Sequence, residues 1–522
     1  MTSDIVHQAL MQPQAYPDAP AEIEFKETHV SRLYLTRDFV YKIKKPVDYG
    51  FLNFTTLDRR RFYCEEEVRL NRRFSPDTYL GIKEVRRSSE GVRLDGSGEL
   101  LDYAVWMKRL PDERMLDNLI KARSAELPAT MAPLGALLAR IEADADICLE
   151  NSGMSNLEEV RRNWRENFEQ ITPYTGQTLS TRSLELCRSY VDAFVQSHQE
   201  LLLQRELDGF VRDGHGDLHA EHICLTDPIR IYDCIEFNRR FRIADVAADL
   251  AFLLMDLEVR DRRDLAAELL AGFQRNSAAD PDLDILLPFY KVYRAFVRGK
   301  VESFLSADET VAEALRTEAR RQARRYFNLA LGYLMQPCLI LTCGLMGSGK
   351  TTLARSLAWA TGAEILRSDE IRKELAGDTG KKSSEEGFEE GIYSSQWTRR
   401  TYDTLAQRAT AALHQGRIVI ADASFADSAQ RLRFFELAHV AGRPCFVLHL
   451  TCDTLVLEKR LRARTEKGTD VSDGRIELLG PQEKAFEPPA GPQVLEIDAS
   501  AHIDDNVEYI LDEIIQRAGF PA

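Results

Sequence analysis

The chain has 522 residues and a formal net charge of −15, with 44% hydrophobic and 29% charged residues. This composition is typical of globular proteins with two or three domains, and the acidic balance disfavours a general binder of nucleic acid or anionic membranes. We find no run of about 18 apolar residues that could span a membrane and no basic, apolar signal peptide at the start. The nine cysteines form no CxxC pair, so we expect a reduced, cytoplasmic protein without a zinc knuckle.

The first third of the chain predicts a small β-rich lobe. Short antiparallel strands are expected within residues 22–45, where LYLT and FVYKIKK flank a hairpin turn at Arg37-Asp38. A charged helix is expected over residues 57–74, and helical patterns dominate from about residue 131 onward. One short hairpin, HICLT and IRIYDCIEF around Asp227-Pro228, interrupts the helices. A small β lobe (about 20–110) followed by a helical lobe (about 111–335) predicts an α+β bilobal domain with a nucleotide between its lobes.

A boundary is expected between residues 335 and 336. Residues 309–335 predict one long Arg-rich helix, more suited to a solvated face than to an anionic partner, and Pro337 stops it. Strands and helices alternate beyond this point, which predicts an α/β domain with a parallel sheet over residues 336–522. The expected strands cover residues 339–343, 364–366, 417–421, 445–450 and 494–497. The expected helices cover residues 353–362, 429–442 and 454–464.

A phosphate-binding loop is expected in this second domain. GLMGSGKT, residues 344–351, matches G-x-x-x-x-G-K-[ST], follows an apolar strand and opens a helix. Glycines let backbone N–H groups surround phosphate oxygens, Lys350 reaches the β- and γ-phosphates, and the Thr351 hydroxyl ligates Mg²⁺. The expected nucleotide contacts are Gly344, Gly347, Ser348, Gly349, Lys350, Thr351 and Thr352.

Further charged residues follow the strands of this domain. Asp422 ends RIVIAD and is expected to support the magnesium ion, the alternative being an Asp that begins a turn. Asp369 and Arg372 share a helix face and could orient and deprotonate an acceptor hydroxyl, the alternative being a helix N-cap at Ser368 or Asp369. Arg460 and Arg464 are four apart on one helix face, as in a lid that contacts the transferring phosphoryl group.

Residues 337–500 resemble the P-loop small-molecule kinase group. The resemblance is carried by GLMGSGKTT, SDEIR, VIADASF, RLRARTEKGTDVSDG and Gln482. This group includes gluconate kinases, zeta-toxin kinases and 5′-hydroxyl polynucleotide kinases. By resemblance, Asp369 activates the acceptor, Arg372 binds it, and Arg460 and Arg464 are the lid arginines.

The N-terminal part resembles the aminoglycoside phosphotransferase and choline kinase group of the protein-kinase-like fold. HGDLHAEHI, IYDCIEF and ADVAADLAFLL carry this resemblance. It implies that Asp217 is the catalytic base and Asp233 a metal ligand, and the two flank a tight hairpin that lets them face one site. Asp245 and Asp249 are expected to hold the catalytic segment, and His215 and His219 to organise its loop.

The small lobe is expected to contact the nucleotide. Lys42 in FVYKIKKP is the expected phosphate-pairing lysine, although Lys44 shares its strand face. Its partner is expected within CEEEV; Glu66 is our choice, with Glu67 as the alternative. The segment from Met107 to Leu110 is the expected hinge that meets the adenine.

Two departures from this pattern stand out. ETHVSRL replaces the glycine-rich loop before the lysine strand, and His222 replaces the metal-binding Asn. Neutral imidazole can ligate a metal and suits Mn²⁺ or Zn²⁺ better than Mg²⁺; the alternative is a hydrogen bond within the loop. The whole pattern is similar to bacterial aminoglycoside phosphotransferase-like proteins fused to an ATPase domain.

These features predict a bifunctional kinase with two nucleotide sites. We expect ATP or GTP with Mg²⁺ as cofactors, Mn²⁺ being the alternative at the N-terminal site, and a small-molecule hydroxyl acceptor as substrate. Two alternatives remain open. The N-terminal part could be a nucleotide-sensing pseudokinase that regulates the P-loop kinase, or the C-terminal part could phosphorylate nucleic-acid 5′ ends, which the acidic net charge disfavours.

Overall fold

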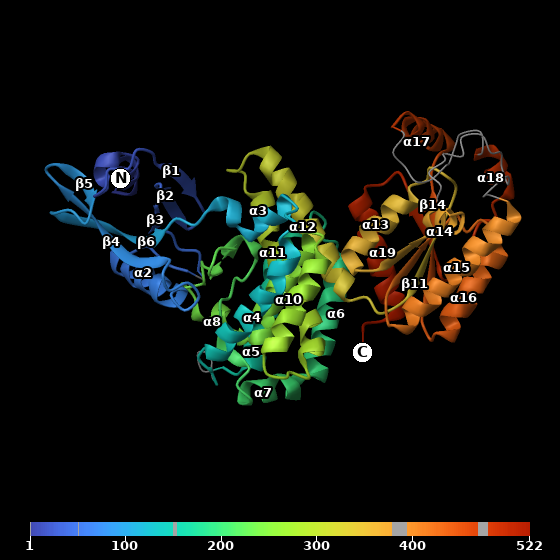
Figure 1. The fold of residues 1–522 in the computed structure, drawn as a ribbon, viewed down its shortest axis with the longest axis horizontal. Helices are drawn as coiled ribbons and strands as arrows, with labels where there is room; N and C mark the ends of the chain where they lie inside the picture. The colour runs from blue at the N-terminus through green and yellow to red at the C-terminus, as the bar shows by residue number, and fades with distance from the viewer. Residues whose placement is uncertain (1, 51, 150–153, 378–393, 468–478, 522) are drawn as a thin grey trace. The chain divides into compact units, whose positions relative to one another are not determined.

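The computed structural model describes residues 2–50, 52–149, 154–377, 394–467 and 479–521, apart from the side chains of residues 2, 3 and 464–467. The chain folds into two compact units, which Figure 1 shows with their elements labelled. Unit 1 comprises Met1–Asn163 with Ser197–Arg294, and unit 2 comprises Trp164–Gln196 with Ala295–Ala522. Two helices, α5 (Asn156–Ile171) and α11 (Leu283–Ala307), contribute residues to both units.

A six-stranded antiparallel sheet forms the small lobe of unit 1, in the order β1-β2-β3-β6-β4-β5. Its strands are β1 (Glu24–Glu27), β2 (Ser31–Leu35), β3 (Phe39–Lys44), β4 (Tyr79–Ser88), β5 (Gly91–Leu94) and β6 (Glu99–Lys108). The expected hairpin around Arg37-Asp38 joins β2 to β3. Helix α2 (Leu57–Asn71) packs against β4 and β6, and α1 (Thr2–Leu10) packs against β5. The predicted small β lobe is therefore confirmed.

Helices dominate the rest of unit 1. They are α3 (Leu116–Lys121), α4 (Leu127–Asp144), α7 (Gln199–Leu207), α8 (Arg239–Arg242), α9 (Val246–Val259) and α10 (Arg263–Asn276), with short 3-10 turns at Asp112–Arg114 and Ala220–His222; a further 3-10 turn, Pro13–Ala15, packs on β5 of the small lobe. Glycine permits the close approach of α4 and α10, because a Cβ on Gly135 would lie 2.2 Å from the Leu269 carbonyl oxygen. Two short antiparallel ladders, β8 (Ile223–Cys224) with β9 (Arg230–Ile231) and β7 (Val211–Asp213) with β10 (Ile243–Asp245), carry the segment predicted to be catalytic.

Unit 2 contains the parallel sheet that the alternating pattern predicts. Its order is β12-β13-β11-β14-β15. The strands are β11 (Leu339–Cys343), β12 (Glu364–Arg367), β13 (Val419–Asp422), β14 (Cys445–Thr451) and β15 (Val494–Asp498), each within about two residues of its expected position. The sheet's helices are α13 (Lys350–Thr361), α14 (Ser368–Leu375), α15 (Ser395–His414), α16 (Ser428–Val440), α17 (Thr454–Lys467), α18 (Leu479–Ala485) and α19 (Ile503–Ala518).

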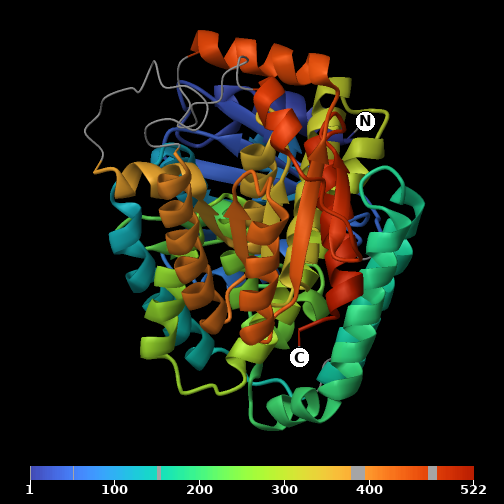
Figure 2. The ribbon, with the colours of Figure 1, turned by 90° about the vertical axis from the view of Figure 1, so that its right-hand side faces the viewer.

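Helices cover both faces of this sheet. Helices α13 and α19 pack together on one face, and α15 and α16 pack together on the other. Figure 2 shows the second face, with α15 and α16 in front of the strands. The predicted α/β fold with a parallel sheet is therefore confirmed. Helices on both faces leave the carboxyl ends of the strands as the edge where ligands bind in such sheets.

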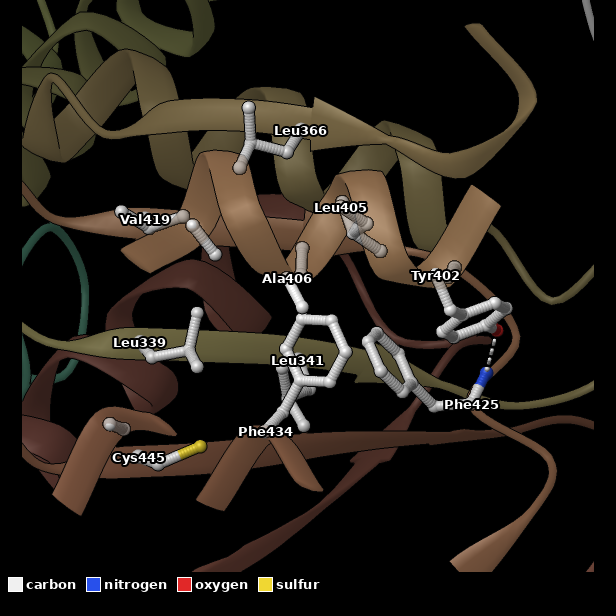
Figure 3. Packing of buried hydrophobic residues seen from close by; sticks show 14 of the residues in the cluster. Leu339, Leu341, Leu366, Tyr402, Leu405, Ala406, Val419, Phe425, Phe434 and Cys445 are labelled. Atoms are coloured by element: carbon white, nitrogen blue, oxygen red, sulfur yellow. Dashed lines mark hydrogen bonds between the residues drawn. The ribbon is translucent and has the colours of Figure 1, made fainter. Parts of the chain in front are cut away.

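Apolar side chains from the sheet and from α15 and α16 form the core of unit 2 (Figure 3). Leu339 and Leu341 point from β11 into this core, and both are fully buried. Three aromatic rings meet edge to face: the Phe425 ring centroid lies 4.9 Å from that of Phe434 and 5.3 Å from that of Tyr402. The Phe425 amide donates to the Tyr402 hydroxyl at 3.3 Å, which fixes the chain just after β13.

Two helices that precede the sheet in sequence also belong to unit 2. They are α6 (Thr181–Ser197) and α12 (Glu313–Tyr333), the second being the predicted Arg-rich helix. Helix α12 packs so closely on α13 that a Cβ on Gly332 would lie 2.1 Å from the Ala360 carbonyl oxygen, so this position requires glycine. At the start of α6, Ser183 donates to the Asp512 carboxylate of α19 at 2.8 Å. The helices of the described segments are all too short or too polar to cross a lipid bilayer.

Candidate functional sites

The phosphate loop lies between β11 and α13, in the strand–loop–helix context expected for it. Gly344, Gly347 and Gly349 have φ values of 144°, 78° and 94°, which side chains other than glycine rarely adopt. A Cβ on Gly344 would also lie 2.7 Å from the Leu450 carbonyl oxygen. Lys350 begins α13 and folds back over the loop, where its Nζ donates to the Gly344 and Leu345 carbonyls at 2.9 and 2.7 Å. Such a loop at a helix N-terminus is suited to phosphate.

A hydroxyl and a carboxylate meet beside the loop. The Thr351 hydroxyl donates to Oδ2 of Asp422 at 2.7 Å, and the Thr342 hydroxyl donates to Oδ1 at 3.1 Å. Asp422 ends β13 and is 6% exposed. A threonine hydroxyl and a buried carboxylate are oxygen ligands of the kind Mg²⁺ prefers, so these residues fit a magnesium ion with its water shell. Thr352, the next residue of α13, is exposed.

Arg367 is a member of this site that the motifs did not reveal. It ends β12, is 6% exposed, and places its Nε 3.4 Å from Oδ2 of Asp422. Its position at the carboxyl end of a parallel strand, directly before Ser368 and Asp369, was the available signal. Burial opposes the charge, but hydrogen bonding to Glu370 and the nearby Asp422 raise the pKa of Arg367 above its ordinary value. The arginine therefore adds positive charge beside the expected magnesium ligand.

The predicted acceptor residues lie together on α14. Arg372 is buried and its Nη1 lies 3.8 Å from Oδ1 of Asp369, whose side chain is 27% exposed. The alternative that Ser368 or Asp369 is the N-cap is wrong, because Arg367 occupies that position and no side chain caps the helix. A partly exposed carboxylate beside a buried guanidinium can orient a hydroxyl and accept its proton.

One of the two predicted lid arginines contacts the phosphate loop. Arg460 on α17 donates to the Ala499 carbonyl at 2.8 Å and to the Ser348 carbonyl at 3.5 Å. The side chain of Arg464 lies outside the described residues. Gln482 on α18 accepts a hydrogen bond from the Met346 amide at 2.8 Å, so a second helix also reaches the loop tip. Ser348 itself is 1% exposed.

Two lysines of β3 form a buried charge network in unit 1. Nζ of Lys42 lies 2.6 Å from Asp233 and 2.9 Å from Glu67. Lys44 donates to Glu67 at 2.7 Å and also contacts Glu236. Glu67 is fully buried, so both lysines share one carboxylate from α2. Lys42, the expected lysine, is the one that reaches Asp233.

The choice of Glu66 as the partner of Lys42 is corrected to its neighbour Glu67. Glu66 pairs instead with Arg69 on its own helix, at 2.7 Å. The reason is helical phase: consecutive residues point about 100° apart, and only Glu67 faces β3. Burial opposes the charge of Glu67, but Lys42 and Lys44 lower its pKa. Burial likewise opposes the charge of Asp233, and Lys42 holds the pKa of that carboxyl well below its ordinary value.

The predicted catalytic loop is held by Asp249 and Arg294. Oδ2 of Asp249 accepts from the His215 amide at 2.6 Å and Oδ1 from the Gly216 amide at 3.0 Å. Arg294 donates to the Gly216 carbonyl at 2.9 Å and lies 3.2 Å from Asp249. His215 Nε2 donates to the Tyr232 carbonyl at 2.9 Å, and burial lowers the pKa of this histidine to about 4. Asp249 and His215 thus organise the loop, as expected.

His222 lies between Asp217 and Asp233. Its Nδ1 donates to the Asp217 carbonyl at 2.9 Å, because a carbonyl oxygen can only accept. The lone pair of the neutral ring is therefore on Nε2, which lies 3.6 Å from Oδ2 of Asp233. Burial and the neighbouring His219 lower the pKa of His222, which favours this neutral form. Asp233 has a φ of 64°, a strained conformation for a residue with a side chain.

A nitrogen lone pair and a carboxylate oxygen face each other at this point. The expected metal ligands His222 and Asp233 thus lie side by side, and they fit an ion that accepts nitrogen ligands better than Mg²⁺ does. The hydrogen bond within the loop, the alternative for His222, is present as well. On β6, Met107 pairs with Val40 of β3, and Leu110 follows the strand. The expected hinge thus leaves the sheet next to the lysine strand.

The phosphate loop and the parallel sheet define a protein of the P-loop class, whose N-terminal unit combines a six-stranded antiparallel sheet with a helical part. Residues 339–489 match the family model described as AAA domain. The chain is 30% identical over 487 residues, 89% of its length, to "Uncharacterized protein Rv2004c" of Mycobacterium tuberculosis, of which it covers 94%. It belongs to the same family as this mycobacterial protein.

Two solved structures are similar to separate parts of the chain. A gluconokinase from Sinorhizobium meliloti is 20% identical, with a TM-score of 0.27 over 35% of this chain and 94% of its own. A choline/ethanolamine kinase family protein from Mesorhizobium loti is 14% identical, with a TM-score of 0.40 over 70% of this chain and 100% of its own. At these scores neither structure assigns a substrate.

Proposed function

We propose that the protein is an ATP-dependent phosphotransferase with two nucleotide sites that phosphorylates hydroxyl groups of a small molecule in the cytoplasm. The observation that carries the proposal is the arrangement at the edge of the parallel sheet. There the loop that ends in Lys350 and Thr351 follows β11, and Asp422, which pairs with Thr351, ends β13. The Asp369–Arg372 pair follows β12. A phosphate loop, a magnesium position and a proton acceptor are the parts that phosphoryl transfer to a hydroxyl requires.

At the C-terminal site, the loop N–H groups and Lys350 hold the phosphates of ATP or GTP. Magnesium, held by Thr351 and Asp422, would neutralise charge on the β- and γ-phosphates. Asp369 accepts the proton of the acceptor hydroxyl as the new O–P bond forms and the bond from the γ-phosphorus to the β–γ bridging oxygen breaks, which releases the nucleoside diphosphate. Arg372 orients the acceptor. Arg460, already at the loop, stabilises the charge of the transferring phosphoryl group, with Arg464 as its partner on the lid.

At the N-terminal site, Lys42 is fixed by Glu67 and pairs with the nucleotide phosphates, while the segment from Met107 to Leu110 meets the base. Asp217 accepts the proton of a second acceptor hydroxyl. Asp233 and His222 would hold a divalent ion, and their oxygen and nitrogen atoms suit Mn²⁺ better than Mg²⁺. The hydrogen bonds of Asp249 to the loop keep Asp217 in position.

One observation favours a second candidate function for the N-terminal site. Lys42 contacts Asp233 directly at 2.6 Å, so the lysine occupies the carboxylate that would hold the ion. An N-terminal site in which Lys42 stays on Asp233 would bind nucleotide without transferring its phosphoryl group, and would regulate the P-loop kinase. We further propose residues 1–335 and 336–522 as the two functional parts, a division that differs from the compact units because α6 and α12 belong to unit 2, where α12 packs on α13 and α19.

Product detection tests the proposal. The full chain is incubated with γ-labelled ATP and a metabolite extract, and labelled products are separated for the wild type, Lys350→Ala and Asp217→Asn. Two active sites give products that disappear one by one with the two variants. A label pattern that only Lys350→Ala abolishes favours the sensing function. The absence of any labelled acceptor with the wild type, in Mg²⁺ and in Mn²⁺, contradicts the phosphotransferase.

A further inference from the structure

Three side chains near the N-terminal site could hold a metal ion together. Asp217, His219 and His222 each offer a ligand atom, and these atoms lie within 4.8 Å of one another. Nδ1 of His222 lies 3.7 Å from Oδ2 of Asp217, and it can ligate an ion once the ring proton moves from Nδ1 to Nε2, which faces Asp233. Nε2 of His219 lies 3.5 Å from Oδ2 of Asp217, and the ring centroids of the two histidines lie 4.1 Å apart. The sequence assigns His219 only to loop organisation, so its place beside the expected catalytic carboxylate is new.

The spacing of these atoms fits a tetrahedral ion. Bonds of about 2.0–2.1 Å to nitrogen and oxygen place neighbouring ligands of a tetrahedral zinc site about 3.4 Å apart. The distance of 3.5 Å between His219 and Asp217 is close to this value and exceeds the usual hydrogen-bond range of about 2.7–3.2 Å. Two imidazoles and one carboxylate are also the donor types that ions such as Zn²⁺ accept more readily than Mg²⁺ does.

The frame around the three residues is fixed before any ion binds. His219 is 4% exposed and its ring lies 5.6 Å from that of Phe252 on α9. The Ala220 amide donates to Asp256 of the same helix at 2.9 Å, which holds the turn that carries His222. The Asp217 side chain is 35% exposed, so the group remains open to an ion from solvent on that side. Three protein ligands would leave a fourth position for water or a phosphate oxygen.

We propose that Asp217, His219 and His222 bind one divalent transition-metal ion of the zinc class, and that this ion inhibits the N-terminal site. Inhibition follows because an ion that shares electron pairs of the Asp217 carboxylate neutralises its charge and lowers its basicity, so Asp217 takes the proton of an acceptor hydroxyl less readily. The binding half of the proposal stands on the three side chains alone. The inhibitory half rests on the proposed function of Asp217.

Direct metal binding to the full chain tests the first half. The chelator-stripped protein is titrated with Co²⁺, whose visible absorption reports tetrahedral nitrogen and oxygen ligands, and Zn²⁺ affinity is measured by competition with a chromogenic chelator. We expect one tight Zn²⁺ per chain, with His219→Gln weakening it about tenfold or more. His29→Gln, which alters an exposed histidine of unit 1, is the matched control and leaves the affinity unchanged. Equal affinities for the wild type and His219→Gln overturn the site.

A second variant covers the case in which His219→Gln does not fold, as judged by circular dichroism. His222→Asn keeps a polar side chain at the position and removes an imidazole ligand, so it also weakens Zn²⁺ about tenfold or more. Unchanged Zn²⁺ affinity in this variant overturns the site equally.

Inhibition is measured in the Lys350→Ala chain, in which the N-terminal site supplies the remaining transfer. We expect Zn²⁺ to suppress Mn²⁺-supported transfer over the concentration range in which it binds. Zinc binding without suppression overturns the inhibitory half and leaves the site. A Lys350→Ala chain without transfer in any ion overturns the N-terminal activity and the inhibition with it, while the binding measurement stands by itself.

Discussion

The phosphate loop of unit 2 occupies eight consecutive residues, 344–351, whereas the lysine network of unit 1 joins positions up to 192 residues apart. In the loop, glycine conformations and a helix N-terminus create from the backbone the surface that we propose binds phosphate. In the network, buried side chains of β3, α2 and the segment after β9 hold one another in place. Local chemistry thus suffices for one site, while the other exists only after the whole unit has folded.

Buried carboxylates also differ between the two units. Asp233 and Glu67 of unit 1 face lysines, which lower their pKa values against the effect of burial. Asp512 of unit 2 faces the Ser183 hydroxyl and the Glu508 carboxylate, and burial raises its pKa to about 7. The first arrangement favours charged groups, and the second favours a protonated acid. Four substitutions sharpen this contrast.

The largest effect is expected from Lys350→Ala. The substitution removes the lysine ammonium, which is the one cation within the phosphate loop, so turnover at the C-terminal site falls on the order of 10³-fold or more. Steady-state phosphate transfer by the full chain in Mg²⁺ is the measurement. Lys459→Ala, an exposed lysine of α17, is the control and retains activity. Comparable turnover in the two variants would show that the loop does not carry the reaction.

Glu67→Gln is expected to destabilise unit 1 by about 3 kcal/mol, because it leaves Lys42 and Lys44 without a shared buried carboxylate. Hydrogen exchange of peptides from β3 and α2 reports the change within that unit. The matched control is Glu66→Gln on the same helix, whose exposed pair with Arg69 contributes at most about 1 kcal/mol. Equal hydrogen-exchange protection of these peptides in the two variants would contradict a stabilising role of the lysine network.

Asp369→Asn is expected to slow transfer at the C-terminal site about 10²-fold while ATP affinity stays the same. Asparagine keeps the shape of the side chain but cannot accept the acceptor's proton. Nucleotide binding is followed by titration with a fluorescent ATP analogue, and transfer by product formation. Glu374→Gln, an exposed residue of α14, serves as control. Full activity of Asp369→Asn would remove this residue from the mechanism.

The last prediction concerns how the folding stability depends on pH, and the change per pH unit expected from Asp512 is small. Its folded-state pKa of about 7 lies above the ordinary value of 3.8, so the folded chain keeps a proton that the unfolded chain releases. Stability from this group is complete below about pH 4 and is lost as the pH rises to about 7, by at most about 1.4 kcal/mol per pH unit. Asp512→Asn should flatten this slope. Thermal melts of both chains from pH 4 to 8 measure it, and identical slopes would refute the assignment.

The parallel sheet and its site could be predicted because their signals are contiguous. Each of the five apolar strands, and the phosphate loop, is a short contiguous stretch of sequence, and Asp422 is the last residue of one of those strands. Arg367 was missed because a single arginine at a strand end matches no motif. Gln482 was part of the resemblance, but its bond to the Met346 amide joins two segments distant in sequence.

The N-terminal site was harder to predict because its pairings depend on tertiary packing. Asp217, Asp233 and Lys42 came from motifs, and the structure brings Lys42 to Asp233. Three consecutive glutamates on α2 differ only in the direction that each faces, and the position of β3 selects Glu67. The approach of His219 to Asp217 likewise arises from the packing of the loop on α9, which no spacing in the sequence encodes.

The interleaving of the two units has a consequence for inheritance. Because Trp164–Gln196 lies with Ala295–Ala522, the segment Ser197–Arg294 of unit 1 is an insertion within the chain order of unit 2. No single crossover in the gene can therefore remove one unit and leave the other whole. A cut after Tyr333 would leave α12 behind and uncover the face of α13 on which Gly332 packs. Descendants of this gene are expected to keep both parts or lose both.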